Sequence, residues 1–496
     1  MHPDVCRRRP RAADHQHRVI LALALLSTLP FALFAYNSGF GYDALEYLII
    51  GRSLHDGYSL YDIVPSKSPG IYLFVDALIG LGIDFGHVQL AATISTIYAA
   101  TILCTFLAVK PHAGTRAAVL ASVLTGMCAW FMEINFLQPT GFVYLFGLGG
   151  YVQCLRALEP GGRARNWFWC GFWIAIAIQF KSVAAFYGVG ALGALLLWSE
   201  RNRLPSMVAL ASGALVPTIA IALYFAVTGR GADYLQWTFF FPLFEYPANT
   251  AFLAKLYTKL LFFFVLFVAS TLGSLLPAAR RELWRSNPIR VAWLFGALSL
   301  FALLKTQASH YFYPAATFLS IATASGLSLV LKRSSEGRRW QLFVSGAVGV
   351  SLFAASTALY RPDAVARLVQ LRDFGEEVAL RDYVVRHVAP SERLIALQAS
   401  TTVYWLAHRY PNLPLIGMDV QSTRYLELHP GLLAEAIRDA RVDCVELTPG
   451  NLGLQDVRML DSPAARAQIE TLQREVERDF VKRADSPAGF TFWCRR

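Results

Sequence analysis

Long apolar segments constrain this 496-residue chain more than any other feature. There are about eleven, and most approach the ~20 residues that a helix needs to cross a bilayer. The chain is 55% hydrophobic and 16% charged, which is too apolar for an ordinary soluble protein of this length. We therefore expect a mainly α, polytopic membrane protein. The segments lie at residues 19–37, 87–109, 115–132, 139–156, 166–180, 183–198, 205–228, 256–278, 290–304, 311–331 and 340–359.

Basic residues between these segments set the expected topology. The formal net charge of +11 would point to nucleic acid in a soluble protein, but in a membrane protein it reflects basic cytoplasmic loops. All the basic connectors fall on one side if residues 70–84 do not cross the membrane. The positive-inside rule places that side and the N-terminus in the cytoplasm, and we expect no nucleic-acid partner. The connectors are RRRPR, KPHAGTR, RALEPGGRAR, SERNR, ARRELWRSNPIR and LKRSSEGRR.

Residues 70–84 are too short and too interrupted to form a span. Asp76, Gly80 and Gly82 break the apolar run, and Asp84 ends it. We therefore expect a helix at the membrane surface or half-inserted into it. The N-terminal RRRPRAADHQHR with its apolar run also resembles a cleaved signal peptide. Cleavage would remove one span and leave the remaining topology unchanged, and we favour retention of the segment.

The unusual polar residues gather on the opposite, external side of this topology. The most concentrated group is a charged cluster in the loop 38–86, directly after the first apolar segment. This side also receives the turn at 133–138, Lys181, the aromatic loop 229–255, the KTQASHY segment and everything after Tyr360. The charged residues of the loop 38–86 are Asp43, Glu46, Asp56, Asp62 and Lys67.

The last part of the chain changes character and predicts a small soluble α/β domain. Residues 361–411 have amphipathic helical spacing, then a short apolar strand, then another helix. RVDCVELTP and GFTFWCRR read as strands, with SPAARAQIETLQREVERDF as a helix between them. We expect a basic cytoplasmic N-terminus over residues 1–18, a transmembrane domain over 19–360 and this extracytoplasmic domain over 361–496.

Seven cysteines are present, and two of them fall in the soluble domain. Cys444 and Cys494 are able to pair in an oxidising compartment, although the spacing alone does not determine the pairing. The other five lie in or near spans or at the cytoplasmic end and show no metal-ligand spacing. We expect no metal site and no cofactor, and catalysis that survives chelation.

Several motifs of soluble nucleotide and hydrolytic enzymes are missing from the sequence. It contains no Walker-type loop, strand-coupled Gly-rich fingerprint, HExxH motif or Ser nucleophile elbow. The sequence instead offers acidic and basic residues at a membrane surface, next to apolar segments long enough to hold a lipid tail.

The order of residues in the loop 38–86 resembles a known family. Asp43, Tyr47, Gly57 and Tyr61, followed by SKSPGIY and a surface helix, are similar to the first external loop of polyprenyl-phosphate-sugar-dependent glycosyltransferases of the GT-C superfamily. That group contains the protein O-mannosyltransferases and the aminoarabinose transferase of lipid A. The segments CGFWIAIAIQFKS and ASHYFYPA and the soluble tail extend the resemblance over nearly the whole chain.

The chain also departs from the family pattern. Members typically show an acidic pair at the start of this loop and a Lys-Pro-Pro turn at its end, whereas this chain has Ala44 in the second acidic position and Lys67-Ser68-Pro69-Gly70 for the turn. The family's usual acid near the start of the later helix is replaced in NFLQPTGF by Gln138 and Thr140.

The resemblance implies a membrane glycosyltransferase that moves a sugar from a polyprenyl-phosphate donor to an extracytoplasmic acceptor, with inversion at the anomeric carbon. Such a donor carries its own leaving group, so one base and one cation suffice. Asp43 would be the general base, and Lys67 would contact the donor phosphate. Further candidate contacts of the donor are Tyr47, Glu133, Lys181, His310 and Tyr311.

Each assignment in the loop has a structural alternative. Asp43 is also suited to capping the helix that it begins. Glu46, one turn later, is consistent with pairing to Arg52 or with facing water. Lys67 is also long enough to snorkel to the membrane surface, and Glu133 fits a solvated loop end as well as a second acid.

Lys181 lies between two short apolar runs without an acid nearby in the sequence. Burial of a charge at membrane depth costs roughly 2.5–3.5 kcal/mol on insertion scales, so we expect a lipid phosphate or an acid of the first loop as its partner. A turn at the external surface is the alternative. His310 and Tyr311 fit sugar or phosphate binding, and Tyr at an interface is also an ordinary aromatic-belt residue.

Two other classes of function fit a chain of this kind. A transporter or flippase for a lipid-linked substrate would place charges along its path, but this sequence lacks visible inverted repeats and concentrates its charges in external loops. A catalytically inactive relative is the other alternative. We favour the glycosyltransferase, as a multi-pass protein of the bacterial inner membrane with its site facing the periplasm or exterior.

Overall fold

The computed structural model falls into two compact units. The first contains the described residues within 28–39, 87–228 and 285–371, and the second contains those within 40–86, 229–245 and 372–496. The structure describes residues 28–63, 65, 67–132, 134–199, 203–245, 285–301, 309–333, 371–397, 400–415, 420–439, 441–447, 462–483, 486 and 489–496.

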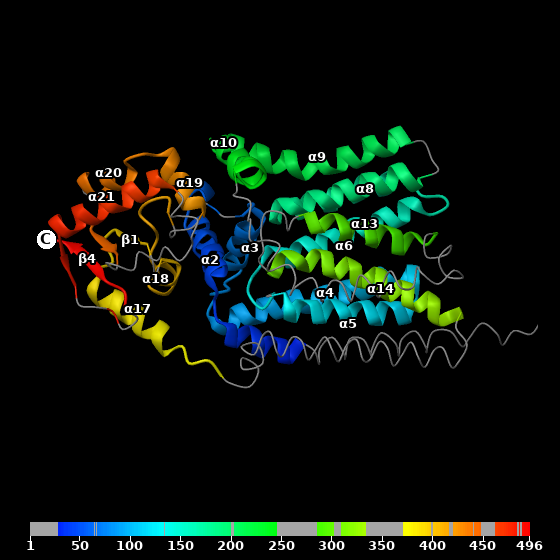
Figure 1. Ribbon diagram of the computed structural model, residues 1–496, viewed down its shortest axis with the longest axis horizontal. Helices are drawn as coiled ribbons and strands as arrows, with labels where there is room; N and C mark the ends of the chain where they lie inside the picture. The colour runs from blue at the N-terminus through cyan, green and yellow to red at the C-terminus, as the bar shows by residue number, and fades with distance from the viewer. Residues whose placement is uncertain are drawn as a thin grey trace, which may run out of the picture. The chain divides into compact units, whose positions relative to one another are not determined.

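The first unit is a bundle of helices that run side by side (Figure 1). Residues 28–38 are helical, and two 3₁₀ turns, η3 (Ser182–Ala184) and η6 (Ser309–Phe312), precede α8 and α14. The remaining helices are α4 (His87–Ala113), α5 (Thr115–Phe131), α6 (Pro139–Leu158), α7 (Ala164–Phe180), α8 (Ala185–Trp198), α9 (Arg203–Val227), α13 (Asn287–Ser299) and α14 (Tyr313–Arg333).

Every predicted span that lies wholly within the described residues is helical, which confirms the mainly α fold. Among the described residues, three helices are long and apolar enough to cross a membrane: His87–Ala113, Arg203–Val227 and His310–Leu329. The predicted segments 256–278 and 340–359, the start of 19–37 and the end of 290–304 lie outside the described residues. The number of eleven spans therefore stays a prediction.

Glycine brings α7 and α9 into close contact. A Cβ atom on Gly171 would lie 2.0 Å from the backbone oxygen of Leu210, and one on Gly213 would lie 1.9 Å from that of Phe168. Small residues that let helix backbones approach are typical of membrane helix pairs. This contact leaves the rest of α9 covered with exposed apolar side chains, among them Leu215, Ile219 and Leu223.

The second unit combines the loop 40–86 and the segment 229–245 with the C-terminal domain. In the loop, α2 (Tyr42–His55) is followed by the 3₁₀ turn η2 (Leu60–Asp62) and by α3 (Gly70–Gly80). The apolar run within 70–84 contains a helix of 11 residues, which is about 17 Å long and too short to span a bilayer. Its position at the membrane surface stays a prediction. The segment 229–245 adds α10 (Gly231–Leu235) and η4 (Gln236–Glu245).

The C-terminal part of this unit is an α/β domain, as the sequence predicts. Its four-stranded sheet has the order β1-β2-β4-β3, with β1 and β2 parallel and the other pairs antiparallel. The strands are β1 (Leu394–Ala396), β2 (Cys444–Glu446), β3 (Phe480–Lys482) and β4 (Phe492–Arg495), and the helices are α17 (Gly375–His387), α18 (Ser400–Leu406), α19 (Val420–Leu428), α20 (Leu432–Arg438) and α21 (Pro463–Asp479).

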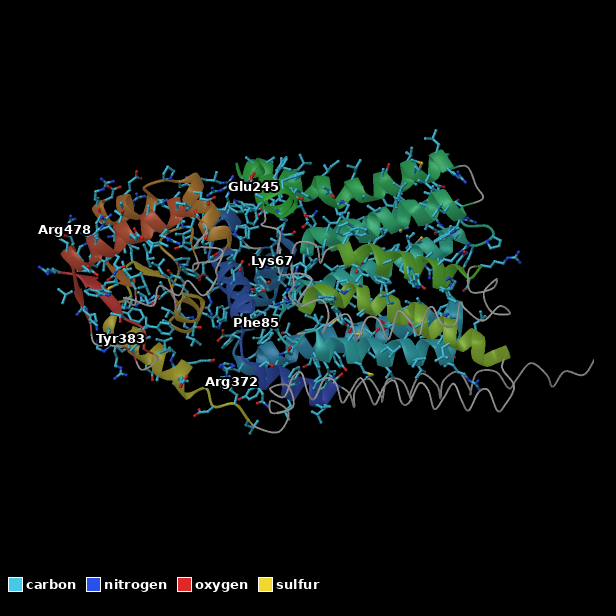
Figure 2. All side chains as sticks on the ribbon, in the orientation of Figure 1. Lys67, Phe85, Glu245, Arg372, Tyr383 and Arg478 are labelled. Carbon is cyan, nitrogen blue, oxygen red and sulfur yellow. A yellow bond between two sulfur atoms is a disulfide. The ribbon has the colours of Figure 1, made fainter. Side chains whose placement is uncertain are left out.

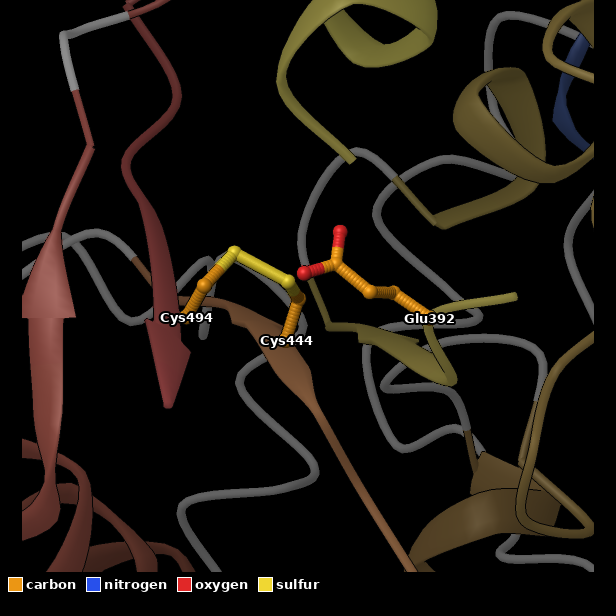
Figure 3. Close-up of side chains that lie close together, drawn as sticks. All are labelled: Glu392, Cys444 and Cys494. Carbon is orange, nitrogen blue, oxygen red and sulfur yellow. A yellow bond between two sulfur atoms is a disulfide. The ribbon is translucent and has the colours of Figure 1, made fainter. Parts of the chain in front are cut away.

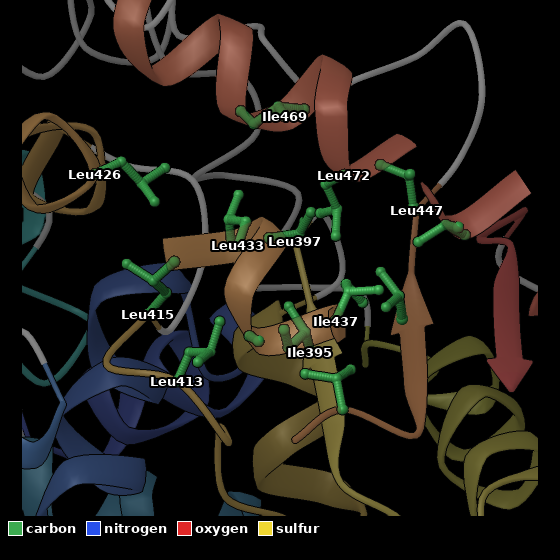
Figure 4. Packing of buried hydrophobic residues seen from close by; sticks show 14 of the residues in the cluster. Ile395, Leu397, Leu413, Leu415, Leu426, Leu433, Ile437, Leu447, Ile469 and Leu472 are labelled. Atoms are coloured by element: carbon green, nitrogen blue, oxygen red, sulfur yellow. The ribbon is translucent and has the colours of Figure 1, made fainter. Parts of the chain in front are cut away.

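One apolar face of α21 forms much of the core of this domain. Ser462 caps the helix by accepting a hydrogen bond from the N–H of Ala465 at 3.3 Å, and Pro463 occupies the first turn. The buried residues recur every three to four positions at Ala465, Ile469, Leu472 and Val476, as one face of a helix requires. They pack against leucine and isoleucine side chains of β1, α19 and α20 (Figure 4).

A disulfide joins Cys444 and Cys494 across the paired strands β2 and β4 (Figure 3). The pairing left open by the sequence is therefore present. At the starts of β1 and β2, the guanidinium of Arg393 holds the carboxylate of Asp443 through two N–H groups at 2.8 and 3.0 Å. Both contacts connect segments that are about 50 residues apart.

Candidate functional site

Asp43 lies in the first turn of α2, with its side chain partly buried. The N-cap of this helix is Gly41, whose φ of 67° is in the left-handed region that favours glycine. Asp43 is the second helical residue, so the alternative that it caps the helix is wrong. A carboxylate in this position still gains from the positive end of the helix dipole.

Tyr47 lies one turn after Asp43 and is fully buried. Its hydroxyl oxygen is 3.5 Å from the Asp43 carboxylate, which is a long hydrogen bond. Its ring packs edge-on against Tyr72 of α3, with 5.8 Å between the ring centres. Tyr47 therefore connects the first turn of α2 to α3.

Glu46 lies on the same face of α2, three residues after Asp43, and only 2% of it is exposed. Its carboxylate accepts a hydrogen bond from the Tyr72 hydroxyl at 2.7 Å. The expectation that Glu46 faces water is therefore wrong. The Arg52 guanidinium instead lies over the ring of Trp405.

Lys67 joins the same network through its backbone (labelled in Figure 2). Its N–H donates a hydrogen bond to the Tyr72 hydroxyl at 3.1 Å. Pro69 and Gly70 then begin α3, with the Leu73 N–H bonded to the Pro69 carbonyl oxygen at 3.1 Å. We call Asp43, Glu46, Tyr47, Lys67 and Tyr72 the loop cluster.

Close packing of α2 against α3 holds the loop cluster together. A Cβ atom on Gly51 would lie 2.4 Å from Cγ1 of Val75 and 3.2 Å from the carbonyl oxygen of Tyr72. Only glycine allows this approach without movement of a helix. The position of Tyr72 opposite Glu46 therefore depends on Gly51, although Gly51 makes no side-chain contact with either residue.

Lys181 follows α7 and is 4% exposed. Its ammonium nitrogen lies 3.3 Å from the ring centre of Tyr311, a cation–π contact. Lys181 lies in the turn between α7 and η3, and its side chain is packed inside the bundle rather than in water. His310 is 8% exposed, and its ring centre lies 4.8 Å from that of Tyr311. The structure thus brings together Lys181, directly after α7, with His310 and Tyr311 of η6, and we call these three residues the lysine–aromatic cluster.

Glu133 lies outside the described residues. Around it, the turn between α5 and α6 is unusually polar for a buried segment. Asn135, Gln138 and Thr140 are each at most 6% exposed, and the Asn135 amide donates to the Ser38 hydroxyl at 2.6 Å. The residues that replace the family's later acid are therefore buried amide and hydroxyl groups.

Ion pairs connect the segment 229–245 to other parts of the second unit. Arg230 pairs with Asp62, at the end of η2. Arg424 of α19 pairs with Glu245 at 3.0 Å (Glu245 is labelled in Figure 2).

Burial raises the pKa of the Tyr61 phenol, so this residue of η2 is neutral at physiological pH.

Some members of the site were not assigned from the sequence. Tyr72 lies in the SKSPGIY segment, where the sequence gives it no role, and the sequence favours a structural role for Glu46. The spacing of Asp43, Glu46 and Tyr47 at i, i+3 and i+4 was the available signal, because it places all three on one face of a helix. Nothing local in the sequence points to Tyr72, which is 26 residues from Glu46.

Within the described part of the chain, one group has metal-ligand spacing: Glu392 with Cys444 and Cys494 (Figure 3). Both sulfur atoms are joined in the disulfide. A disulfide sulfur is not the thiolate that binds metals, so this group does not fit a metal site.

A family model of dolichyl-phosphate-mannose-protein mannosyltransferases matches residues 66–227. No curated protein matches the chain. Two structures of ArnT from Cupriavidus metallidurans are similar in fold. The one bound to undecaprenyl phosphate has a TM-score of 0.62 at 15% identity, covering 95% of this chain and 97% of ArnT. The apo structure has a TM-score of 0.60 at 14% identity, covering 97% and 98%.

The archaeal oligosaccharyltransferase AglB from Archaeoglobus fulgidus, in complex with an inhibitory peptide and a dolichol-phosphate, is also similar. Its TM-score is 0.52 at 13% identity, and the match covers 96% of this chain and 74% of AglB. These sequence identities are too low to assign a function, but the structural similarity covers nearly the whole chain. The chain therefore shares the fold of these glycosyltransferase structures, and its residues 66–227 are similar to the mannosyltransferase family model.

Proposed function

We propose that this protein is a membrane glycosyltransferase that moves a sugar from a polyprenyl-phosphate donor to an extracytoplasmic acceptor. The observation that carries the proposal is the loop cluster. It links Asp43, through Tyr47 and Tyr72, to the backbone of Lys67. A base and a cation on one rigid support are what this transfer needs. The lipid phosphates named for ArnT and AglB agree with a donor of this class.

In the proposed reaction, Asp43 accepts the proton of the acceptor hydroxyl as that oxygen attacks the anomeric carbon. The new carbon–oxygen bond forms while the bond from the anomeric carbon to the phosphate oxygen breaks. The polyprenyl phosphate leaves with the electron pair, and the Lys67 ammonium balances its charge. Attack opposite the leaving group inverts the anomeric centre. Asp43 suits the base better than Glu46 because it is only partly buried, whereas Glu46 is almost fully enclosed.

We further propose the lysine–aromatic cluster as a donor contact. A buried ammonium next to Tyr311 and His310 offers positive charge and ring surfaces to a phosphate or a sugar. Glu133 is retained as a candidate contact from the sequence alone. The proposed location is the bacterial inner membrane, with the N-terminus in the cytoplasm and the C-terminal domain outside.

A transfer assay tests this function against the transporter alternative. Sealed vesicles containing the purified protein are given undecaprenyl-phosphate hexoses and pentoses, each radiolabelled in the sugar, with membranes of the source cell as acceptor. A glycosyltransferase should produce labelled acceptor and free undecaprenyl phosphate in equal amounts. Labelled donor that crosses the bilayer with its glycosidic bond intact would instead identify a transporter.

A further inference from the structure

We propose that Glu46 and Tyr72 form a positioning pair that holds the Lys67 backbone against α2, an inference that rests on the function proposed above. Neither residue would touch the substrate. Their hydrogen bond would instead determine where the phosphate-binding lysine lies relative to the helix that carries Asp43. Glu46 is thus a second carboxylate of the site with a role different from that of the base.

The Tyr72 hydroxyl connects both partners. It donates to Glu46 at 2.7 Å and accepts from the Lys67 N–H at 3.1 Å, so it uses its donor and an acceptor position at once. Tyr72 is fully buried and Glu46 is 2% exposed. A short hydrogen bond to a carboxylate is stronger than one between neutral groups, and burial shields it from competing water.

The surrounding packing leaves little freedom for this pair. Tyr47 packs edge-on against the Tyr72 ring, and Gly51 brings α3 against α2. The Lys67 backbone is therefore bonded to Tyr72 of α3 and, through Tyr72, to Glu46 of α2. A side-chain cation on a fixed backbone loses less conformational entropy when it binds phosphate than a cation on a mobile loop does.

The test measures the Kd for undecaprenyl phosphate with the purified full-length protein, together with the kcat and KM of transfer. Tyr72→Phe removes the bridging hydroxyl, and Glu46→Leu removes the carboxylate. We expect each to weaken binding about tenfold, the effect of one lost hydrogen bond, mainly through KM. The double variant should be no worse than Tyr72→Phe, because that substitution already removes both hydrogen bonds of the bridging hydroxyl. Glu46→Gln keeps an acceptor oxygen and should weaken binding less than about threefold.

Tyr151→Phe is the matched control, because Tyr151 is also a buried tyrosine, and its hydroxyl donates to the Pro288 carbonyl oxygen at 3.0 Å. It should leave binding unchanged. Equal weakening by Tyr151→Phe, or additive effects in the double variant, would overturn the positioning role. Loss of turnover in Glu46→Gln with binding intact would also overturn it, since that result identifies a catalytic acid.

The failure of this inference is separable from that of the proposed function. If Tyr72→Phe binds undecaprenyl phosphate normally while Lys67→Ala does not, the positioning pair is wrong and the donor assignment stands. If the unmodified protein binds no undecaprenyl phosphate, the proposed function itself is wrong.

Discussion

The guanidinium of Arg52, on α2, lies 3.5 Å from the ring centre of Trp405 on α18 and donates a hydrogen bond to the Trp405 carbonyl oxygen at 3.3 Å. Burial lowers the pKa of Arg52, but arginine remains charged at physiological pH. The helix that carries Asp43 is therefore attached to the C-terminal domain. A nearby contact between Tyr410 and Asp56 joins the same two segments.

Replacement of Trp405 should weaken this attachment. Trp405→Leu keeps an apolar side chain and the backbone acceptor but removes the ring, and we expect a loss of about 1–2 kcal/mol from the partly desolvated cation–π contact. Thermal unfolding of Trp405→Leu, of Arg52→Met and of the double variant gives a double-mutant cycle that measures this coupling. Additive effects of the two substitutions would show that the pair contributes nothing.

Gly51→Ala should separate α2 from α3. The new Cβ atom would overlap Val75, whose branched side chain has little freedom to move, so we expect a loss of about 1–3 kcal/mol in stability together with reduced transfer. The control is Gly80→Ala, because the nearest atom to a Cβ there is 3.8 Å away. Normal stability in Gly51→Ala would contradict the close helix contact. Adding Val75→Ala to the Gly51→Ala variant should restore the stability, because it removes the overlapping side-chain atoms.

The Asp443–Arg393 pair predicts a specific pH dependence. The hydrogen bonds from Arg393 lower the pKa of Asp443 below its ordinary value of 3.8, so the folded state favours the ionised carboxylate. This stabilisation is complete above the ordinary pKa and is lost as the pH falls through the lowered one. The difference in unfolding midpoint between the unmodified protein and Asp443→Asn should be constant near neutral pH and shrink below about pH 4. A difference that grows on acidification would contradict this assignment.

Transfer activity should persist in EDTA. In the proposed reaction, the charge of the departing phosphate is balanced by the ammonium group of Lys67, so no divalent ion is needed for that step. Initial rates with and without EDTA give the comparison. A rate that is lost in EDTA and restored by a divalent ion would contradict this prediction.

The helices of the bundle could be predicted closely because their apolar runs have the length that a membrane imposes. Predicted segments such as 87–109 and 205–228 coincide with α4 and α9. In the C-terminal domain, the amphipathic pattern predicts α21, but it does not predict β3, which begins at Phe480 directly after the helix. The end of an amphipathic helix carries no signal for a strand of three residues.

The candidate site was only partly predictable. Asp43 and Lys67 were found from the order of residues in one loop, whereas the hydrogen bond that Glu46 accepts and the contact between Arg52 and Trp405 depend on tertiary packing. Arg52 and Trp405 are 353 residues apart. No local pattern specifies such a contact, because it arises only when the elements pack.

The most direct test of the central claim is sugar transfer by Asp43→Asn in vesicles supplied with the undecaprenyl-phosphate sugar that the unmodified protein uses. Asparagine has nearly the same shape but does not accept the acceptor's proton, so we expect transfer to fall by at least ~100-fold, with normal protein level and normal binding of undecaprenyl phosphate. Transfer by Asp43→Asn at the rate of the unmodified protein would contradict Asp43 as the base.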